Sequence, residues 1–212
     1  GQSVEDHTPP PTPPEVVEAF EVGAVEARTG ALLLSGQAGG DVEGAMIWAV
    51  SHRGDDGIAT LPFVVEVEGR SLLAGRIGAD IVIGLYAYVV DDDGVVVDHI
   101  AQGVVLEPDI YADRIITSGL KFVGRFDLPP GDYALRVMVR NQRTSAFFLA
   151  WNLLTLPPGE DLSPQLLPPL FPDTTGNWAV ARQSGTEAAV VLGDDTALLP
   201  AARPVLLEDR PA

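Results

Sequence analysis

Residues 121–140 read KFVGRFDLPPGDYALRVMVR, and this stretch decides the expected fold class. Apolar and charged positions alternate through residues 121–128, and residues 133–140 repeat the alternation. Such a period of two places one face of an antiparallel strand in a core and the other toward water. Pro129-Pro130-Gly131-Asp132 stands between the two runs, and we expect it to close a hairpin. The stretch therefore predicts two half-buried strands joined by a turn.

The tyrosine that follows this turn adds an architectural signal. Gly131-Asp132-Tyr133 resembles the glycine turn and tyrosine that open a late strand in many immunoglobulin-like sandwiches. A tyrosine at that position hydrogen-bonds back across the corner and fixes it. Its expected role is structural, and it carries no chemistry of its own.

The same pattern continues outward along the chain. Residues 61–68 alternate in the same way, and three further turn sequences are expected to close hairpins: Glu68-Gly69-Arg70, Asp91-Asp92-Asp93-Gly94 and Asn141-Gln142-Arg143-Thr144. Helical periodicity is convincing nowhere, and the best short candidate is residues 14–20. Short strands separated by turns at intervals of roughly ten residues indicate a sandwich or barrel. We therefore expect an all-β, antiparallel, immunoglobulin-like β-sandwich.

Two runs are apolar on both faces. They are residues 81–90 and 147–154. A sandwich strand normally shows one face to water, so the second face of each run needs cover. The tails, a small helix or another protein could supply that cover, and the chain's own extensions are the favoured interpretation.

Proline marks both ends of the chain. We expect a proline-rich tail over residues 1–17, a β-sandwich domain over 18–157 and an extended proline-rich segment over 158–212. The last segment also has the pattern of an extra hairpin over residues 176–192. Its leucines and phenylalanine are expected to anchor it to the domain, because exposed apolar clusters are otherwise a liability.

The charge balance limits the expected partners. The 212-residue chain has 13 Lys and Arg against 30 Asp and Glu, a formal net charge of −17. That balance repels phosphate backbones, so nucleic acid is not an expected partner. The apolar runs are too short to cross a bilayer, so any membrane association is expected to be peripheral. The start Gly1-Gln2-Ser3 looks processed and favours an extracytoplasmic location: periplasm, cell surface or secreted.

The acidic turn is the strongest candidate for a metal site, and it fits poorly. When Gly94 is aligned with the glycine of a calcium loop, Asp91 and Asp93 fall at ligand positions, but Val89 occupies the first one. A solvated hairpin turn is favoured, and no metal or other cofactor is expected. Whether Asp91, Asp93 and Asp98 ever bind a cation is left open.

Catalytic signals are weak. The chain contains no cysteine, which excludes disulfides and thiolate chemistry. His7, His52 and His99 are isolated in different segments, and no Gly-x-Ser-x-Gly motif occurs. We assign no catalytic residue and expect no enzyme, although a hydrolase whose carboxylates converge only in the fold stays the least favoured alternative. Arg53-Gly54-Asp55 spells an adhesion tripeptide, but these residues are also ordinary turn material.

Three segments carry a family resemblance: Val89–Val96 (VVDDDGVV), Leu128–Val137 (LPPGDYALRV) and Val139–Asn141 (VRN). With them, residues 80–157 resemble the β-sandwich module appended to von Willebrand factor A-related proteins of acidobacterial type. The resemblance implies an accessory module of secreted bacterial proteins. The Asp-x-Ser-x-Ser metal loop of the A domain itself is missing, so the resemblance implies a setting and leaves activity open.

The expected function is a non-catalytic structural or interaction protein that docks onto a larger assembly or onto copies of itself. The expected interaction residues lie on an apolar strand and in the C-terminal segment: Phe148, Leu154, Leu167, Leu170, Phe171 and Trp178. The alternative is a carbohydrate-binding or adhesion module that uses Trp178, because Trp48 and Trp151 have the spacing of core residues.

Overall fold

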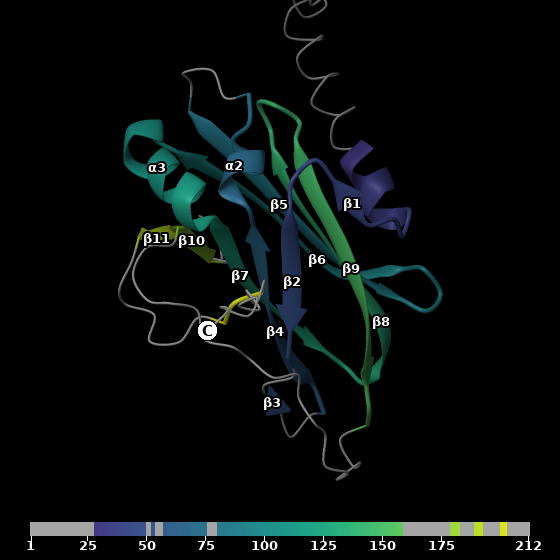
Figure 1. The fold of residues 1–212 in the computed structure, drawn as a ribbon. Helices are drawn as coiled ribbons and strands as arrows, with labels where there is room; N and C mark the ends of the chain where they lie inside the picture. Colours follow the sequence, from purple (N-terminus) through teal and green to yellow (C-terminus); the bar gives the residue numbers. More distant parts are fainter. Residues whose placement is uncertain are drawn as a thin grey trace, which may run out of the picture. The chain divides into compact units, whose positions relative to one another are not determined.

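The computed structural model describes residues 28–49, 52–53, 57–75, 80–158, 179–182, 189–192 and 200–202 (Figure 1). Contacts divide the chain into two compact units, Gly1–Gly36 and Gln37–Ala212. In the first unit, residues 28–34 are helical. The helix ends at Gly36, whose φ of 69° lies in the left-handed region that glycine enters without strain.

The second unit contains two β-sheets. The first sheet has the order β1-β9-β8-β5-β6 among the described residues. Its strands are β1 (Gly39–Gly40), β5 (Ile81–Asp91), β6 (Val96–Leu106), β8 (Gly131–Asn141) and β9 (Phe147–Leu156). Every pairing in it is antiparallel. Strand β5, apolar on both faces in the sequence, therefore lies inside the sheet with a neighbour on each side.

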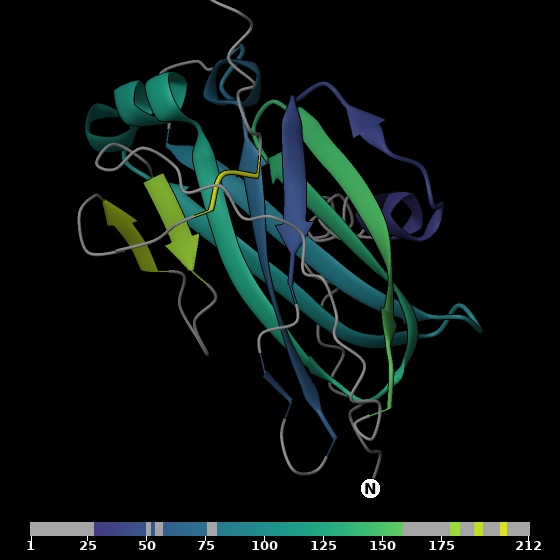
Figure 2. The same cartoon turned by 60° about the horizontal axis from the view of Figure 1, so that its bottom comes forward.

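The second sheet has the order β11-β10-β7-β4-β2 in the described part of the chain, with the short β3 also on β4 (Figure 2). Its strands are β2 (Gly44–Trp48), β3 (His52–Arg53), β4 (Ala59–Val67), β7 (Leu120–Leu128), β10 (Ala179–Arg182) and β11 (Ala189–Leu192). The β10–β7 pairing is parallel, and β10 and β11 form the expected antiparallel hairpin. The C-terminal hairpin thus extends a sandwich sheet.

The strand order confirms the expected immunoglobulin-like sandwich. In the immunoglobulin scheme, β2-β4-β7 correspond to A-B-E, and β9-β8-β5-β6 correspond to G-F-C-C′. Alternate residues of both sheets meet in one core. Phe63 of β4 and Phe126 of β7 stack there, with ring centroids 5.5 Å apart. Gly124 lies opposite Phe63 and leaves room for its ring, because a Cβ at Gly124 would lie 2.5 Å from the ring.

The predicted tyrosine corner is present. The Tyr133 hydroxyl donates to the Pro129 carbonyl at 3.0 Å. The expected hairpin at Pro129–Asp132 is wrong, however, because β7 and β8 belong to different sheets. Two consecutive prolines lack the N–H groups that a hairpin ladder needs, so the chain turns a corner there and crosses the sandwich.

The other three turns differ in outcome. Asp91–Gly94 joins β5 to β6, and Asn141–Thr144 joins β8 to β9, so both of these hairpin predictions are confirmed. The prediction at 68–70 is wrong, because the short helix α2 (Gly69–Leu72) begins there. Its start is fixed by the Glu68 carboxylate, which accepts from the Arg70 and Ser71 N–H groups at 2.9 and 2.6 Å.

Helix α3 (Pro108–Ser118) was not expected from the sequence. Pro108 stands in its first turn, where a missing N–H costs nothing, and Gly119 ends it. Only Ala112 and Ile115 of the helix are fully buried, which is too narrow a stripe for periodicity to reveal. Gly69 of α2 lies directly against the Ile115 carbonyl, so a side chain at position 69 would collide with the backbone of α3.

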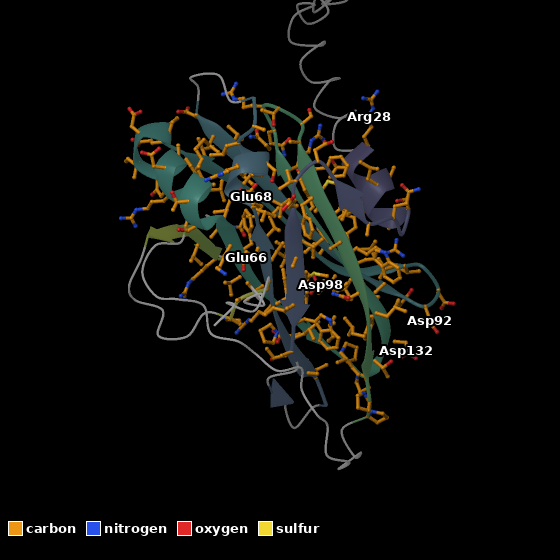
Figure 3. All side chains as sticks on the ribbon, viewed as in Figure 1. Arg28, Glu66, Glu68, Asp92, Asp98 and Asp132 are labelled. Carbon is orange, nitrogen blue, oxygen red and sulfur yellow. The ribbon has the colours of Figure 1, made fainter. Side chains whose placement is uncertain are left out.

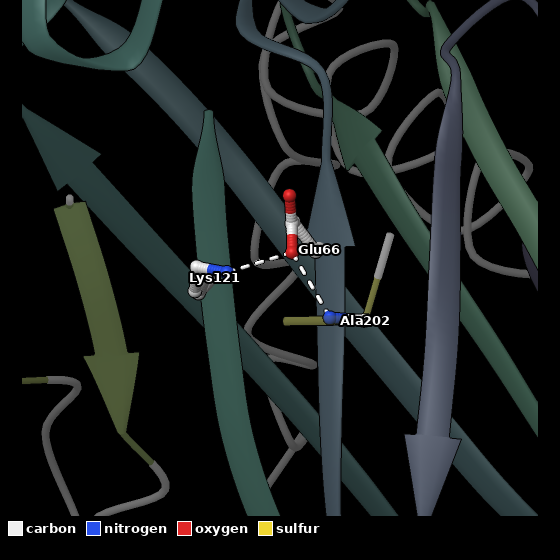
Figure 4. A network of polar contacts seen from close by, with 3 residues as sticks. All are labelled: Glu66, Lys121 and Ala202. Carbon is white, nitrogen blue, oxygen red and sulfur yellow. Dashed lines mark hydrogen bonds and ion pairs between the residues drawn. The ribbon is translucent and has the colours of Figure 1, made fainter. Parts of the chain in front are cut away.

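Lys121 is an exception to the predicted alternation. Arg125 and Asp127 of β7 are exposed as expected, but Lys121 on the same face is 0% exposed. Its Nζ lies 2.7 Å from Glu66 Oε2 of β4, and that oxygen also accepts from the Ala202 N–H at 3.1 Å (Figure 4). The chain near Ala202 therefore lies over the outer side of β4, and it turns a water-facing pair into a buried one.

A candidate interaction surface on the outer face of one sheet

The structure places two of the expected interaction residues in the core. Phe148 and Leu154 are 7% and 3% exposed, and both point between the sheets. Leu167, Leu170, Phe171 and Trp178 lie outside the described residues. Phe148 and Leu154 are therefore unavailable to a partner while the sandwich is folded, and this correction moves attention to the other side of β9.

That other side of β9 is exposed at Trp151 and Leu153, whereas Leu149 on the same side is buried. Trp151 is 39% exposed and Leu153 is 70% exposed, so the expectation that Trp151 is a core residue is wrong. The core takes Phe148 and Leu154, and a period of two then sends Trp151 and Leu153 outward. Leu153 is therefore largely open to water, and Trp151 is open in part.

Trp151 begins a row that crosses the four long strands of the sheet. Trp151 lies opposite Arg136 of β8, Arg136 lies opposite Tyr88 of β5, and Tyr88 lies opposite His99 of β6. The Tyr88 and His99 rings meet edge to face, with centroids 6.0 Å apart. Four neighbouring strands thus present an aromatic–cationic row on one surface, which we call the outer face.

A second row, from Leu153 to the start of β6, runs beside the first. It continues through Ala134 and Val90 to Val96. Leu153 and Val96 are exposed at its two ends, whereas Ala134 and Val90 are buried. The outer face therefore combines apolar margins with an aromatic and cationic centre.

Tyr86 is held in place on the other side of the aromatic–cationic row. Gln142 Nε2 donates to the Tyr86 hydroxyl at 2.8 Å. The Tyr86 ring lies over Gly84, where a Cβ would come within 2.8 Å of it. The position of the Tyr86 side chain is therefore fixed, because its hydroxyl is held by Gln142 and its ring packs on Gly84.

The acidic cluster lies at the hairpin end of the same sheet. Asp91 accepts the Val95 N–H at 2.7 Å, and Asp98 accepts the N–H of His99 at 2.7 Å. Asp92 lies at the exposed tip of the turn (Figure 3). Within the described ranges, no three His, Cys, Asp or Glu side chains are arranged to hold a metal ion. The hairpin-turn interpretation of this motif fits these contacts.

The remaining sequence candidates do not converge with the outer face. Trp48 is half-buried and packs against the core, as its spacing predicted. His52 and Arg53 form β3 on the opposite sheet. His7, Gly54 and Asp55 lie outside the described residues. Of the three histidines, His99 alone is placed by the structure on this face.

Sequence reasoning missed the row because it treated each strand separately. The signal was available in two turns: Asp91–Gly94 and Asn141–Thr144 each fix the register of the strands they join. Counting outward from the second turn aligns Arg136 with Trp151. The same count from the first turn pairs Tyr88 with Asp98, because a bulge at Val89/Val90 shifts the register by one residue and brings His99 opposite Tyr88 instead. The β5–β8 pairing has no local signal, because these strands are separated by β6, α3 and β7.

The Tyr133 hydroxyl lies at the turn end of this sheet. Burial raises the pKa of Tyr133 above its usual value, and the nearby Asp91 carboxylate raises it further. The phenol is therefore held in its neutral form as a hydrogen-bond donor to Pro129. Its chemistry is that of a structural brace.

Comparisons with known proteins identify no family. No protein-family model and no curated protein matches the chain. Among solved structures, Bacteroides uniformis β-glucuronidase is similar over 53% of this chain, at 13% identity and a TM-score of 0.36. A calcium-binding mutant of B. uniformis β-glucuronidase 2 gives 12% and 0.35, and that enzyme bound covalently to cyclophellitol-6-carboxylate aziridine gives 13% and 0.35. The chain spans 13% of the length of each of these proteins.

The helices of the described residues are too short or too polar to cross a membrane.

Proposed function

We propose that this chain is a non-catalytic, extracytoplasmic β-sandwich module that docks onto a partner protein through its outer face. The observation that carries the proposal is the exposure of Trp151 and Leu153 beside Arg136 on one face of a sheet of antiparallel strands. Trp, Tyr and Arg supply most of the binding energy at protein interfaces, and apolar neighbours exclude water around them. The sandwich serves as the rigid support that holds these side chains in register.

The partner can be found at this surface and then studied in purified form. A photo-crosslinking residue at position 153 of the full chain would join to the partner, which mass spectrometry identifies. The same residue at position 110, on exposed α3, is the control, because Ile110 is also a large apolar side chain open to water. A partner joined at position 153 and not at position 110 supports the proposal.

Affinity then tests the side chains. Trp151→Ser and Leu153→Ser are each expected to weaken binding of the purified partner by at least about tenfold in calorimetry, as interface centres do. Ile110→Ser removes a similar exposed apolar group elsewhere and is expected to leave the affinity unchanged. Wild-type affinity in both β9 variants would falsify the proposal.

Carbohydrate binding is the second candidate, and the aromatic row favours it. Tyr88, His99 and Trp151 present three rings on one face beside Arg136, which suits a ligand with both apolar faces and hydrogen-bonding groups. A glycan array read with the wild-type chain and Trp151→Ser separates the candidates. Binding that disappears in the variant favours a glycan, and an array without signal favours the protein partner.

A further inference from the structure

We infer that the free edge of β6 pairs with β6 of a second copy of this chain, and that the two copies form a twofold-symmetric dimer with one continuous sheet. Within the described residues, β6 is the last strand of its sheet and pairs only with β5. At 11 residues it is as long as any strand of the sandwich. An uncovered edge of this length is a template for another strand.

The direction of its peptide groups follows from one hydrogen bond. The Val82 carbonyl of β5 accepts from Gln142 N–H at 2.8 Å. The backbone N–H and C=O groups of Val82 and of every second residue after it therefore point toward β8. The backbone groups of the residues between them point toward β6. These residues are Ile83, Leu85 and Ala87, and they lie opposite Val104, Gln102 and Ile100.

In β6, the residues between Ile100, Gln102 and Val104 direct their backbone groups away from β5. The N–H and C=O groups of Ala101, Gly103 and Val105 face outward from the edge of the sheet. All three residues are exposed, and Val105 reaches 67%. A Cβ at Gly103 would meet nothing within 4 Å, so the middle of the edge is open to an approaching backbone.

Beyond the bulge at Val96–Asp98, this edge has few of the features that block strand addition. Natural edges carry proline, lysine or inward charges, and β6 (VVDHIAQGVVL) has none of the first two and one carboxylate, at Asp98. Its central residues Ala101 and Gly103 are small. The chemistry of the edge therefore specifies an extended, uncharged strand as its occupant.

A second copy meets that specification with compatible charges. When β6 pairs antiparallel with itself about an axis at Gly103, Ala101 lies opposite Val105 of the second copy, and the outward peptide groups of both strands face each other. The two Asp98 carboxylates lie on opposite sides of the axis, so the one charged residue of each strand never faces its equivalent. The two copies still repel each other at long range, because each chain has a formal net charge of −17.

The long-range repulsion gives the dimer a recognisable salt dependence. Raising the ionic strength screens the charge and is expected to strengthen self-association. Sedimentation equilibrium of the full chain over a concentration series, at about 0.05 M and about 0.5 M salt, measures this effect. A monomer–dimer equilibrium that tightens with salt is expected, and a monomer at every concentration in both buffers overturns the inference.

Two edge variants and a matched control locate the interface. Ala101→Pro removes one outward N–H without touching the β5 ladder, and Val105→Lys adds the charge that natural edges use. Each is expected to weaken dimerisation at least about tenfold. Ile110→Lys makes the same change of charge at another exposed β-branched residue and is expected to keep the dimer. A dimer retained by both edge variants contradicts the inference.

Amide exchange reads the pairing directly, even if one variant unfolds. In the wild-type chain, the Ala101, Gly103 and Val105 amides are expected to exchange slowly only at high protein concentration. Ile100, Gln102 and Val104 are expected to be protected at every concentration by their bonds to β5. Equal, concentration-independent exchange at all six positions would exclude pairing at this edge. These readouts involve neither Trp151 nor the outside partner, so they stand or fall separately from the proposed function.

Discussion

Tyr133 closes the corner between the two sheets, and its ionisation should limit stability at high pH. Because its pKa is raised in the folded chain, its contribution to stability is complete below the unfolded value of about 10 and is lost as the pH rises through the folded value. Urea unfolding from about pH 8 to about pH 11 should therefore show a falling free energy of unfolding in that alkaline window.

Tyr133→Phe tests the cause of this decline. It removes the hydrogen bond to Pro129, so we expect a loss of about 1 kcal/mol at neutral pH. The alkaline decline should become shallower than in the wild type, because the group whose pKa is raised in the folded chain is gone. An unchanged alkaline slope would show that Tyr133 is not the cause of the decline.

The Glu66–Lys121 pair should behave as a buried pair. Lys121→Met leaves the Glu66 carboxylate covered and without its cation, and we expect a loss of about 3–5 kcal/mol in urea unfolding. The double variant Glu66→Gln with Lys121→Met removes both charges and should recover part of that loss. Thr155→Val, which breaks an exposed 2.6 Å bond to Asp132, is the control and should cost under about 1 kcal/mol. A similarly small cost for Lys121→Met would show that water reaches the pair.

Strand β7 depends on a glycine that no turn requires. Gly124 faces Phe63 so closely that Gly124→Ala must displace a ring already stacked on Phe126, and we expect a loss of about 1–3 kcal/mol. Gly103→Ala is the matched control, because Gly103 also lies in a strand and its Cβ would meet open space. That change should be neutral or stabilising by up to about 1 kcal/mol. Thermal and urea unfolding measure the stability of both variants. An equal loss in the two would show that the contact with Phe63 is not what requires glycine at position 124.

Elements with a strong local signal could be predicted, and those set by distant contacts could not. The strands around residues 121–140 and the turns at 91–94 and 141–144 were correct, because alternation and turn residues are local properties. Helix α3 was missed, since it buries only Ala112 and Ile115 and has little periodicity to read. The turn at 68–70 was misassigned because Glu68-Gly69-Arg70 suits a hairpin as well as a helix start.

The candidate surface was harder to predict than the fold. Choosing which side of β9 faces the core requires the register with β8, so Phe148 and Trp151 were assigned to the wrong sides. Lys121 illustrates the same limit, since its buried partner Glu66 also binds Ala202, far along the sequence.

For the molecule as a whole, the β6 edge and the outer face belong to the same sheet. Pairing of two β6 strands would place two copies of the Trp151–His99 row on one continuous surface. A partner with repeated binding sites would then gain affinity from the second contact, which becomes intramolecular once the first has formed. The proposed dimer and the proposed partner surface would therefore reinforce each other.

The hydrogen bond from Ala202 to Glu66 joins residues 136 positions apart. During synthesis, therefore, β4 and β7 are complete long before the segment that seals their ion pair has been made, and contacts this distant form late. Until then Glu66 and Lys121 are partly hydrated, and a nascent chain that stalls before residue 202 exposes a charged, unfinished patch. Chaperones and proteases can recognise such a patch, so the segment around Ala202 has a protective role during synthesis as well as a stabilising one in the folded chain.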